Sequence, residues 1–383
     1  MKIPAVLAVT AILAGCASQP PERRVDASLF NDQWFAAPSE RISAADVFAM
    51  SAEMREYLAT EITPGMKERD VQKTLFDRLY AEGQLKLDYD ATTTRNAAQA
   101  FAARSGNCLS LVLLTAALAR ELGLPVRFQM VYVDEAWSRR GGIEFSSDHV
   151  NVTLLAKTGI GTRSSLRGSD LTIDFMPPED LASRRTRVLA GNTIVAMYMN
   201  NRAAESLGEP PFNRAYWWAR AAIAEDPGYI PAYNTLGIVY KLHGDLREAQ
   251  RVFEWILELE SENTIAMGNL VMVYKALDMT ADADALAARL EAIRPYPPFY
   301  YFDLGVEAMK QQDYLAARRL FTKHIQRDAF HDQSHYWLGL AYYQLGDVKR
   351  AEREIAIAID ASTTSADREL YTAELDRLRA TRH

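Results

Sequence analysis

Three residue types in this chain could together do chemistry: a cysteine, a histidine and an aspartate. Cys108 begins the apolar stretch "CLSLVLLTAALAREL", His149 begins "HVNVTLL", and Asp174 lies within "LTIDF". A thiolate is a strong nucleophile, an imidazole can take up and return its proton, and a carboxylate can hold the imidazole in one orientation. These residue types suit acyl transfer through a thioester.

The position of Cys108 favours a reactive thiol. The sequence predicts a helix over 108–122, with Ser105 or Asn107 as its N-cap and Gly123 as its stop. Cys108 then lies in the first helical turn, where free N–H groups and the helix dipole favour a thiolate. The alternative is that Cys108 is a core residue, since a lone cysteine on an apolar helix is usually buried and inert.

The elements around this helix can bring the three side chains together. Residues 42–62 have helical periodicity with Ser43 as a candidate N-cap, whereas 126–133, 149–155 and 171–175 are β-branched, aromatic or alternating and predict strands. A helix that carries the cysteine, followed by one strand with the histidine and another with the aspartate, places all three at one edge of a sheet.

A second aspartate competes for the role of orienting the histidine. Asp148 directly precedes His149 in the chain. Neighbouring residues of a strand point to opposite faces of the sheet, so Asp148 would point away from the imidazole. We therefore predict that Asp174 is the orienting carboxylate.

The C-terminal half repeats every 34 residues. Two columns of this period are constant, one leucine and one alanine: Leu236, Leu270, Leu304 and Leu338, with Ala215, Ala249, Ala283, Ala317 and Ala351. This is the period and pattern of tetratricopeptide (TPR) repeats, which are helix–turn–helix units. We predict five units over 196–365, at 196–229, 230–263, 264–297, 298–331 and 332–365, and a capping helix over 366–383.

Such an array forms a concave groove. By analogy with other TPR proteins, groove positions in the last two units hold an aromatic strip that would bind a partner: Phe299, Phe302, Tyr336 and Tyr343. The alternative is that the protein's own N-terminal domain covers this strip. His331 and His335 in "HDQSH" resemble a zinc helix only superficially, because the repeat frame separates them into a turn and the following helix, and we predict no metal site.

The N-terminus predicts export and lipidation. Residues 1–15 form a short apolar segment after Lys2, typical of a secretory signal, and Leu13-Ala14-Gly15-Cys16 resembles the bacterial lipoprotein box. Cys16 would then be lipidated, Cys108 would have no disulfide partner in the chain, and 16–40 would be a tether. Ordinary signal cleavage nearby is the alternative. Ala17 favours the outer membrane over the inner one.

Composition limits the partners. The formal charge is −7 without a basic block, which argues against nucleic acid as a partner. No second apolar run reaches eighteen residues, so the lipid is the only predicted membrane attachment.

The stretches "SGNCLSLVLLTAALARELGLPVRF", "DHVNV" and "LTIDF" resemble the transglutaminase-like superfamily, which is related to papain-like cysteine peptidases. The resemblance covers about 90–180 and implies an α+β domain, which we place at 41–185, with the cysteine on a helix and the histidine and aspartate on an antiparallel sheet. It implies that Cys108, His149 and Asp174 act as nucleophile, base and orienter without a cofactor. One departure is that His149 is followed by Val-Asn-Val, without the tryptophan found near it in many members.

Two functions follow as expectations. The first is a lipoprotein of the cell envelope that faces the periplasm, hydrolyses peptide or isopeptide amides or transfers their acyl group to an amine, and binds protein or peptide through its TPR groove. The second is a non-catalytic adaptor in which the transglutaminase-like domain and the repeats only bind protein. The reactivity of Cys108 distinguishes them.

Overall fold

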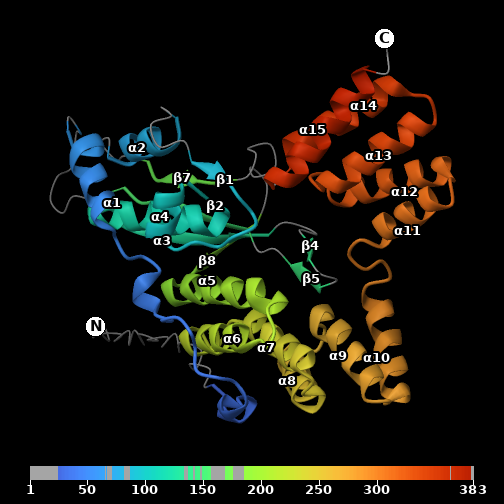
Figure 1. Cartoon of the computed structure of the whole chain (residues 1–383). Helices are drawn as coiled ribbons and strands as arrows, with labels where there is room; N and C mark the ends of the chain where they lie inside the picture. The colour runs from blue at the N-terminus through green and yellow to red at the C-terminus, as the bar shows by residue number, and fades with distance from the viewer. Residues whose placement is uncertain are drawn as a thin grey trace, which may run out of the picture.

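The fold has an N-terminal part built from helices and a small sheet and a C-terminal part built only from helices (Figure 1). The computed structural model describes residues 25–64, 66, 71–81, 87–132, 137–140, 143–146, 149–156, 169–175, 185–362 and 364–380. The predicted signal segment 1–15, Cys16 and Asp148 lie outside the described residues.

A four-stranded antiparallel sheet with the order β7-β6-β3-β8 forms the centre of the N-terminal part. Its strands are β3 (Val126–Val131), β6 (His149–Leu154), β7 (Leu171–Ile173) and β8 (Thr186–Leu189). Two smaller pairs are β1 (Asp88–Tyr89) with β2 (Ser105–Gly106), and β4 (Trp137–Arg140) with β5 (Ile143–Ser146). The predicted α+β class, with an antiparallel sheet, is confirmed.

The helices of this part are α1 (Ala52–Tyr57), α2 (Val71–Phe76), α3 (Ala97–Ala103) and α4 (Cys108–Glu121). The single helix expected over 42–62 is instead broken. A 3-10 turn covers Ala44–Asp46, and α1 begins after Ser51, whose hydroxyl accepts a hydrogen bond from the Met54 N–H at 3.2 Å. Ser43 makes no such cap.

Helix α4 packs on strand β6 and is the most deeply buried helix of this part. Asn107 is its N-cap, because the Asn107 Oδ1 accepts a hydrogen bond from the Ser110 N–H at 2.9 Å. Gly106 is required just before the cap, since a Cβ there would lie 2.5 Å from the Ser110 Cβ. At the other end Gly123 turns the chain with φ 68°, as predicted for the stop.

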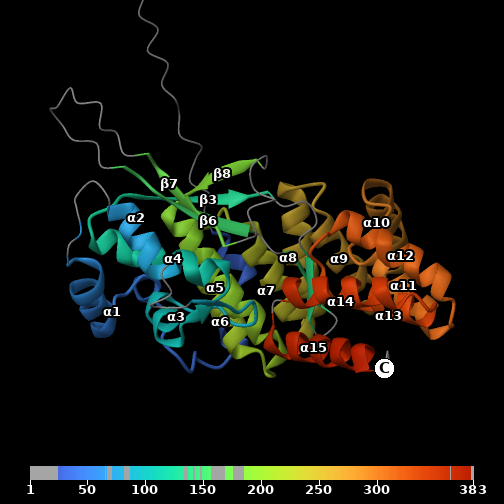
Figure 2. The same cartoon turned by 90° about the horizontal axis from the view of Figure 1, so that it is seen from above.

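The C-terminal part is a curved array of paired helices (Figures 1 and 2). They are α5 (Gly191–Glu205), α6 (Asn213–Glu225), α7 (Ile230–His243), α8 (Leu246–Leu259), α9 (Thr264–Ala276), α10 (Thr280–Ile293), α11 (Tyr300–Lys310), α12 (Tyr314–Arg327), α13 (Asp332–Gln344), α14 (Val348–Ala361) and α15 (Ser365–Ala380). The predicted TPR superhelix is confirmed. In Figure 1 the β4–β5 hairpin is drawn on the inner side of this curve.

The close approach of paired helices explains why glycine recurs in the 34-residue period, at Gly237, Gly305 and Gly339. A Cβ at Gly237 or Gly305 would lie 2.6 Å from the ring of Phe253 or Phe321 on the partner helix. The first pair departs from the predicted frame, because α5 begins at Gly191, five residues before the expected start of the unit at 196.

Residues 25–40 pack against helices α6 and α7 instead of forming part of a free tether. The Phe35 ring stacks on Tyr216 with a 3.9 Å centroid distance, and the Tyr240 hydroxyl donates to the Leu29 carbonyl at 2.8 Å. Arg220 pairs with Asp32 at 2.7 Å. The segment, blue at the lower left of Figure 1, belongs to the folded body.

Candidate active site

Cys108 is the first residue of α4, is half-buried and forms no disulfide with a described residue. It directly follows the Asn107 cap, so its backbone N–H is one of those that the helix leaves without an intrahelical acceptor. Since α4 packs on β6, the cysteine begins its helix beside the strand that carries the histidine.

His149 and Asp174 meet across the sheet. Strands β6 and β7 pair with Val152 opposite Ile173, and continuing this register by one residue places Asn151 opposite Asp174. His149 lies two residues before Asn151 and therefore on the same face of β6. The His149 Nε2 lies 2.6 Å from the Asp174 Oδ1, and both side chains are nearly buried, at 6% and 11% exposed.

The surroundings of His149 favour its charged form. Burial alone would lower the pKa of His149, but hydrogen bonds to Asp174 and to the Cys108 side chain, together with their negative charges, raise it to about 9. Because Asp174 occupies Nε2, Nδ1 is the ring nitrogen that is left for the sulfur. The structure therefore brings Cys108, His149 and Asp174 together in the order sulfur, imidazole, carboxylate.

Asn151 is a further residue of this site that the sequence analysis did not single out. Its Nδ2 donates to the second carboxylate oxygen of Asp174, Oδ2, at 3.0 Å, and the side chain is buried. Asp174 is thus held through both oxygens. The signal was present in the sequence, because the alternation of a strand puts residue 151 on the same face as residue 149.

Asn151 should act as a positioning residue for the imidazole. We expect Asn151→Leu to slow the alkylation of Cys108 at pH 6 by about tenfold or more, because a buried hydrogen bond to a charged group contributes about 1.5–3 kcal/mol. The measurement is the rate of iodoacetamide labelling, followed by intact mass. Thr153→Val is the matched control, since Thr153 is buried on the same face of β6 but bonds to Gln129 and Thr172. Equal effects of both variants would contradict this role.

Tyr89 approaches the start of α4 from strand β1. It lies opposite Gly106 in the parallel β1–β2 pair, and the next residue, Asp90, donates its N–H to the Gly106 carbonyl at 3.0 Å. Burial of its hydroxyl and then the negative charge of Cys108 raise the pKa of Tyr89 above its ordinary value, although a hydrogen bond from the Cys108 backbone N–H lowers it. A neutral hydroxyl is therefore expected near the sulfur, while Tyr89 as a whole is 41% exposed.

The two histidines of "HDQSH" have structural partners. His331 is the N-cap of α13 and His335 lies in its first turn. The His335 Nδ1 lies 2.8 Å from Glu354, and its Nε2 donates to the Ala329 carbonyl at 3.1 Å. Among the described residues, no group of three or more His, Cys, Asp or Glu side chains is arranged to hold a metal ion.

The aromatic residues expected in the TPR groove do not form an exposed strip. Phe299 and Phe302 are only 4% and 9% exposed and lie in the core of their unit. Phe299 has φ 62° as the N-cap of α11, which places it before the helix proper. Tyr336 stacks on Tyr371 of the capping helix with a 4.7 Å centroid distance, and Tyr343 packs partly buried in the same cluster.

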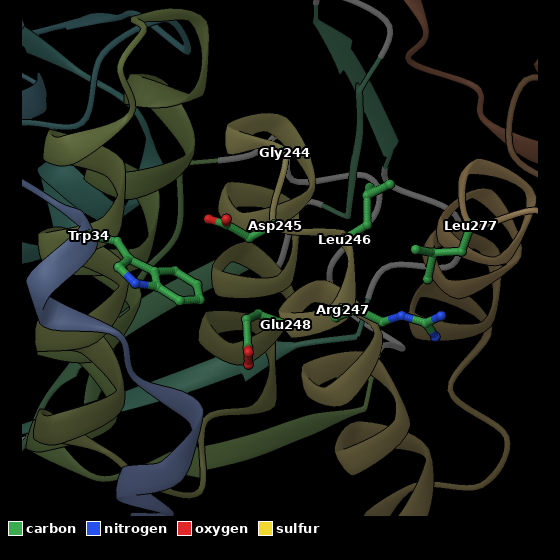
Figure 3. A pocket seen from close by; sticks show the side chains of 7 residues that line it. All are labelled: Trp34, Gly244, Asp245, Leu246, Arg247, Glu248 and Leu277. Carbon is green, nitrogen blue, oxygen red and sulfur yellow. The ribbon is translucent and has the colours of Figure 1, made fainter.

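An open hollow of about 310 Å³ lies elsewhere, where the N-terminal segment passes the α7–α8 turn (Figure 3). Seven residues line it: Trp34, Gly244, Asp245, Leu246, Arg247, Glu248 and Leu277. None of them belongs to the Cys108 site. Two of its charged side chains are already paired, Asp245 with His243 and Glu248 with Arg251.

Comparison with known families defines the class of protein. Residues 56–159 match the model of the transglutaminase-like superfamily, and residues 302–366 match a tetratricopeptide repeat model. The protein thus combines a transglutaminase-like domain with TPR repeats, as the sequence motifs predicted. The first match includes Cys108 and His149 and ends before Asp174.

Some of the solved structures with similarity to this chain are described as TPR proteins. They include the thermophilic TPR protein TTC0263 of Thermus thermophilus, with 13% identity, a TM-score of 0.30 and coverage of 47% of this chain and 98% of that one. BtubC of P. vanneervenii has 20% identity, a TM-score of 0.27 and coverage of 45% and 81%. YrrB, described as a TPR protein with an unusual peptide-binding site, has 21% identity, a TM-score of 0.25 and coverage of 46% and 92%. No curated protein matches the chain.

Proposed function

We propose that the protein is a lipid-anchored thiol acyl-transfer enzyme that cleaves peptide or isopeptide amides. The observation that carries this proposal is the set of Cys108, His149 and Asp174, in which His149 lies 2.6 Å from Asp174 and the interaction with Cys108 helps to raise the pKa of His149. The match to the transglutaminase-like superfamily supports it, since a cysteine hydrolase or transferase site belongs to that class.

In the first step the Cys108 sulfur attacks the amide carbonyl carbon. A C–S bond forms, the C–N bond breaks, and the His149 imidazolium gives its proton to the leaving nitrogen. Asp174 keeps the imidazole in the orientation that presents Nδ1 to the sulfur. The acyl group remains on Cys108 as a thioester.

In the second step His149 takes a proton from water, and the resulting hydroxide attacks the thioester. The C–S bond breaks, the product leaves as a carboxylic acid, and the thiolate–imidazolium pair is restored. An amine in place of water would give transamidation; water is the proposed acceptor.

The oxyanion of the tetrahedral intermediate would be stabilised at the start of α4. The Cys108 backbone N–H points there, and a donor in this position stabilises developing negative charge. The Tyr89 hydroxyl, whose pKa is raised by burial and by Cys108, is a second candidate donor to the same oxygen.

The remaining parts would supply location and a partner. The TPR match supports a platform that binds protein or peptide. The lipoprotein box at Cys16 supports anchoring in the cell envelope, with the domains facing the periplasm and the outer membrane favoured. Among the described residues no helix is long and apolar enough to cross a membrane.

The proposal is tested by trapping the acyl-enzyme. The Cys16→Ser protein is incubated with a mixed library of peptide amides, quenched in acid within seconds, and measured by intact mass, with Cys108→Ala as control. We expect an added acyl mass that maps to Cys108 and is absent from the control. Peptide binding without any added mass, equal in both proteins, would overturn the proposal in favour of the adaptor.

A further inference from the structure

A chain of hydrogen bonds connects the first repeat helix to the start of the cysteine helix. The Thr94 N–H donates to the Glu205 Oε1 of α5 at 2.6 Å. The Asn107 Nδ2 then donates to the Thr94 Oγ1 at 2.8 Å, and the Asn107 Oδ1 accepts from the Ser110 N–H at 2.9 Å. The chain thus ends at the N-cap that directly precedes Cys108.

Two residues at the centre of this chain of hydrogen bonds are buried, and Glu205 at its end is partly exposed, at 21%. Thr94 is only 1% exposed and Ser110 is fully buried. Glu205 is held in turn by Arg202, at 3.1 Å, and Asn201 adds a second donor to the Thr94 Oγ1 at 3.3 Å. A buried donor that loses its acceptor is destabilising, so we expect these hydrogen bonds to be made or lost together.

The Asn107 amide is therefore fixed at both ends. Its oxygen holds the first turn of α4 and its nitrogen is held by Thr94, so the amide cannot rotate without breaking one of the two bonds. The backbone angles of a cap set the direction in which the next residue leaves it. For Cys108, that direction decides where the sulfur and the backbone N–H lie relative to His149.

We propose that Glu205, on the first repeat helix, is a positioning residue for Cys108 and acts through Thr94 and Asn107. This inference rests on the proposed function of Cys108 as a nucleophile. It makes the repeats part of the active-site support, because the TPR array supplies the acceptor that fixes the cap.

The test uses the full-length Cys16→Ser protein and two readouts. The first is amide hydrogen exchange of the peptide that contains Ser110, which reports the cap itself. The second is the pH profile of Cys108 alkylation by iodoacetamide between pH 5 and 9. Glu205→Ala should speed exchange at the cap and slow labelling at pH 6 by roughly threefold to tenfold, as expected for the loss of one supporting hydrogen bond. Glu205→Gln keeps an acceptor and should restore most of both.

Thr94→Val tests whether the effect of Glu205 on Cys108 passes through the hydrogen bond between Thr94 and Asn107, or only through the contact of helix α5 with the N-terminal part. It leaves the Thr94 N–H bond to Glu205 in place but removes the acceptor of Asn107. We expect it to reproduce the effect of Glu205→Ala, and the double variant should be no worse than either, since residues of one relay are not additive. Glu209→Gln is the matched control, because Glu209 pairs with Arg214 and not with Thr94.

Three results would overturn the inference: unchanged exchange at the cap in Glu205→Ala, fully additive effects, or faster exchange with an unchanged labelling profile. Failure of the proposed function is a distinct outcome. In that case the parent protein itself does not label at pH 6, while the exchange measurement still decides whether Glu205 fixes the cap.

Discussion

Iodoacetamide should alkylate Cys108 in the folded Cys16→Ser protein already at pH 6. Burial would lower the pKa of His149, but its contacts with Asp174 and Cys108 raise it to about 9, so the imidazole stays protonated across pH 6–8 and places a positive charge beside the sulfur. His149→Ala removes the positive partner. In that variant labelling should require a pH near 8, where an ordinary cysteine ionises, and the rate at pH 6 should fall by about a hundredfold.

The measurement is intact mass of the folded protein against time, from pH 5 to pH 9. His243→Ala is the matched control, because His243 pairs with Asp245 on the repeat array and not with the residues of the Cys108 site. Its profile should equal that of the parent. If Cys108 is labelled only after denaturation, or if His149→Ala leaves the pH profile of labelling unchanged, Cys108 is a structural residue. Those results would support the non-catalytic adaptor function instead.

The second large effect concerns anchoring. Cys16→Ser should move the protein from the membrane fraction almost completely into the soluble periplasmic fraction. A thioether-linked diacylglyceryl group with an N-acyl chain holds a protein far more tightly than a single chain does, and serine cannot accept it. Fractionation after salt and carbonate washes, followed by immunoblotting, measures the distribution.

Cys108→Ser is the control for this experiment, since it changes the other cysteine and leaves the lipoprotein box intact. It should stay with the membranes. Sedimentation of the Cys16→Ser protein with the membranes after both washes would show that something other than a lipid holds it.

Local rules were enough to place the three side chains. The apolar run predicted the helix with Ser105 or Asn107 as its cap, of which the structure has Asn107. Strand alternation predicted that Asp174, rather than Asp148, faces His149; Asp148 lies outside the described residues. The same alternation also placed Asn151 on that face. Its contact with Asp174 was missed because it depends on the register between β6 and β7, which no single strand reveals.

The aromatic groove could not be predicted in the same way. The repeat frame assumes that each first helix begins at the same position of its unit. In the fourth unit the helix begins only at Tyr300, after Pro297 and Pro298, and Phe299 turns inward with a positive φ. Similarly, Tyr336 is covered by a helix that lies beyond the repeats.

Long-range packing also determines the structure of two other segments, 42–62 and 25–40. The periodicity of 42–62 is compatible with one helix, yet Val47 is buried between the two helical pieces and its carbonyl accepts the Ala97 N–H at 3.1 Å. Residues 25–40 look like a linker by composition. They are ordered because Leu29 and Phe35 enter a core that the repeat helices provide.

The packing of residues 25–40 on α6 and α7 limits how far this side of the molecule can lie from a membrane. Val25 follows Cys16 by nine residues, and a chain of that length spans at most about 30 Å. If Cys16 carries the lipid, the side of the repeats formed by α6 and α7 is held within that distance of the bilayer. A connection this short would keep the protein in a thin layer next to the membrane, so the substrates of the proposed enzyme would be those that lie in or pass through that layer.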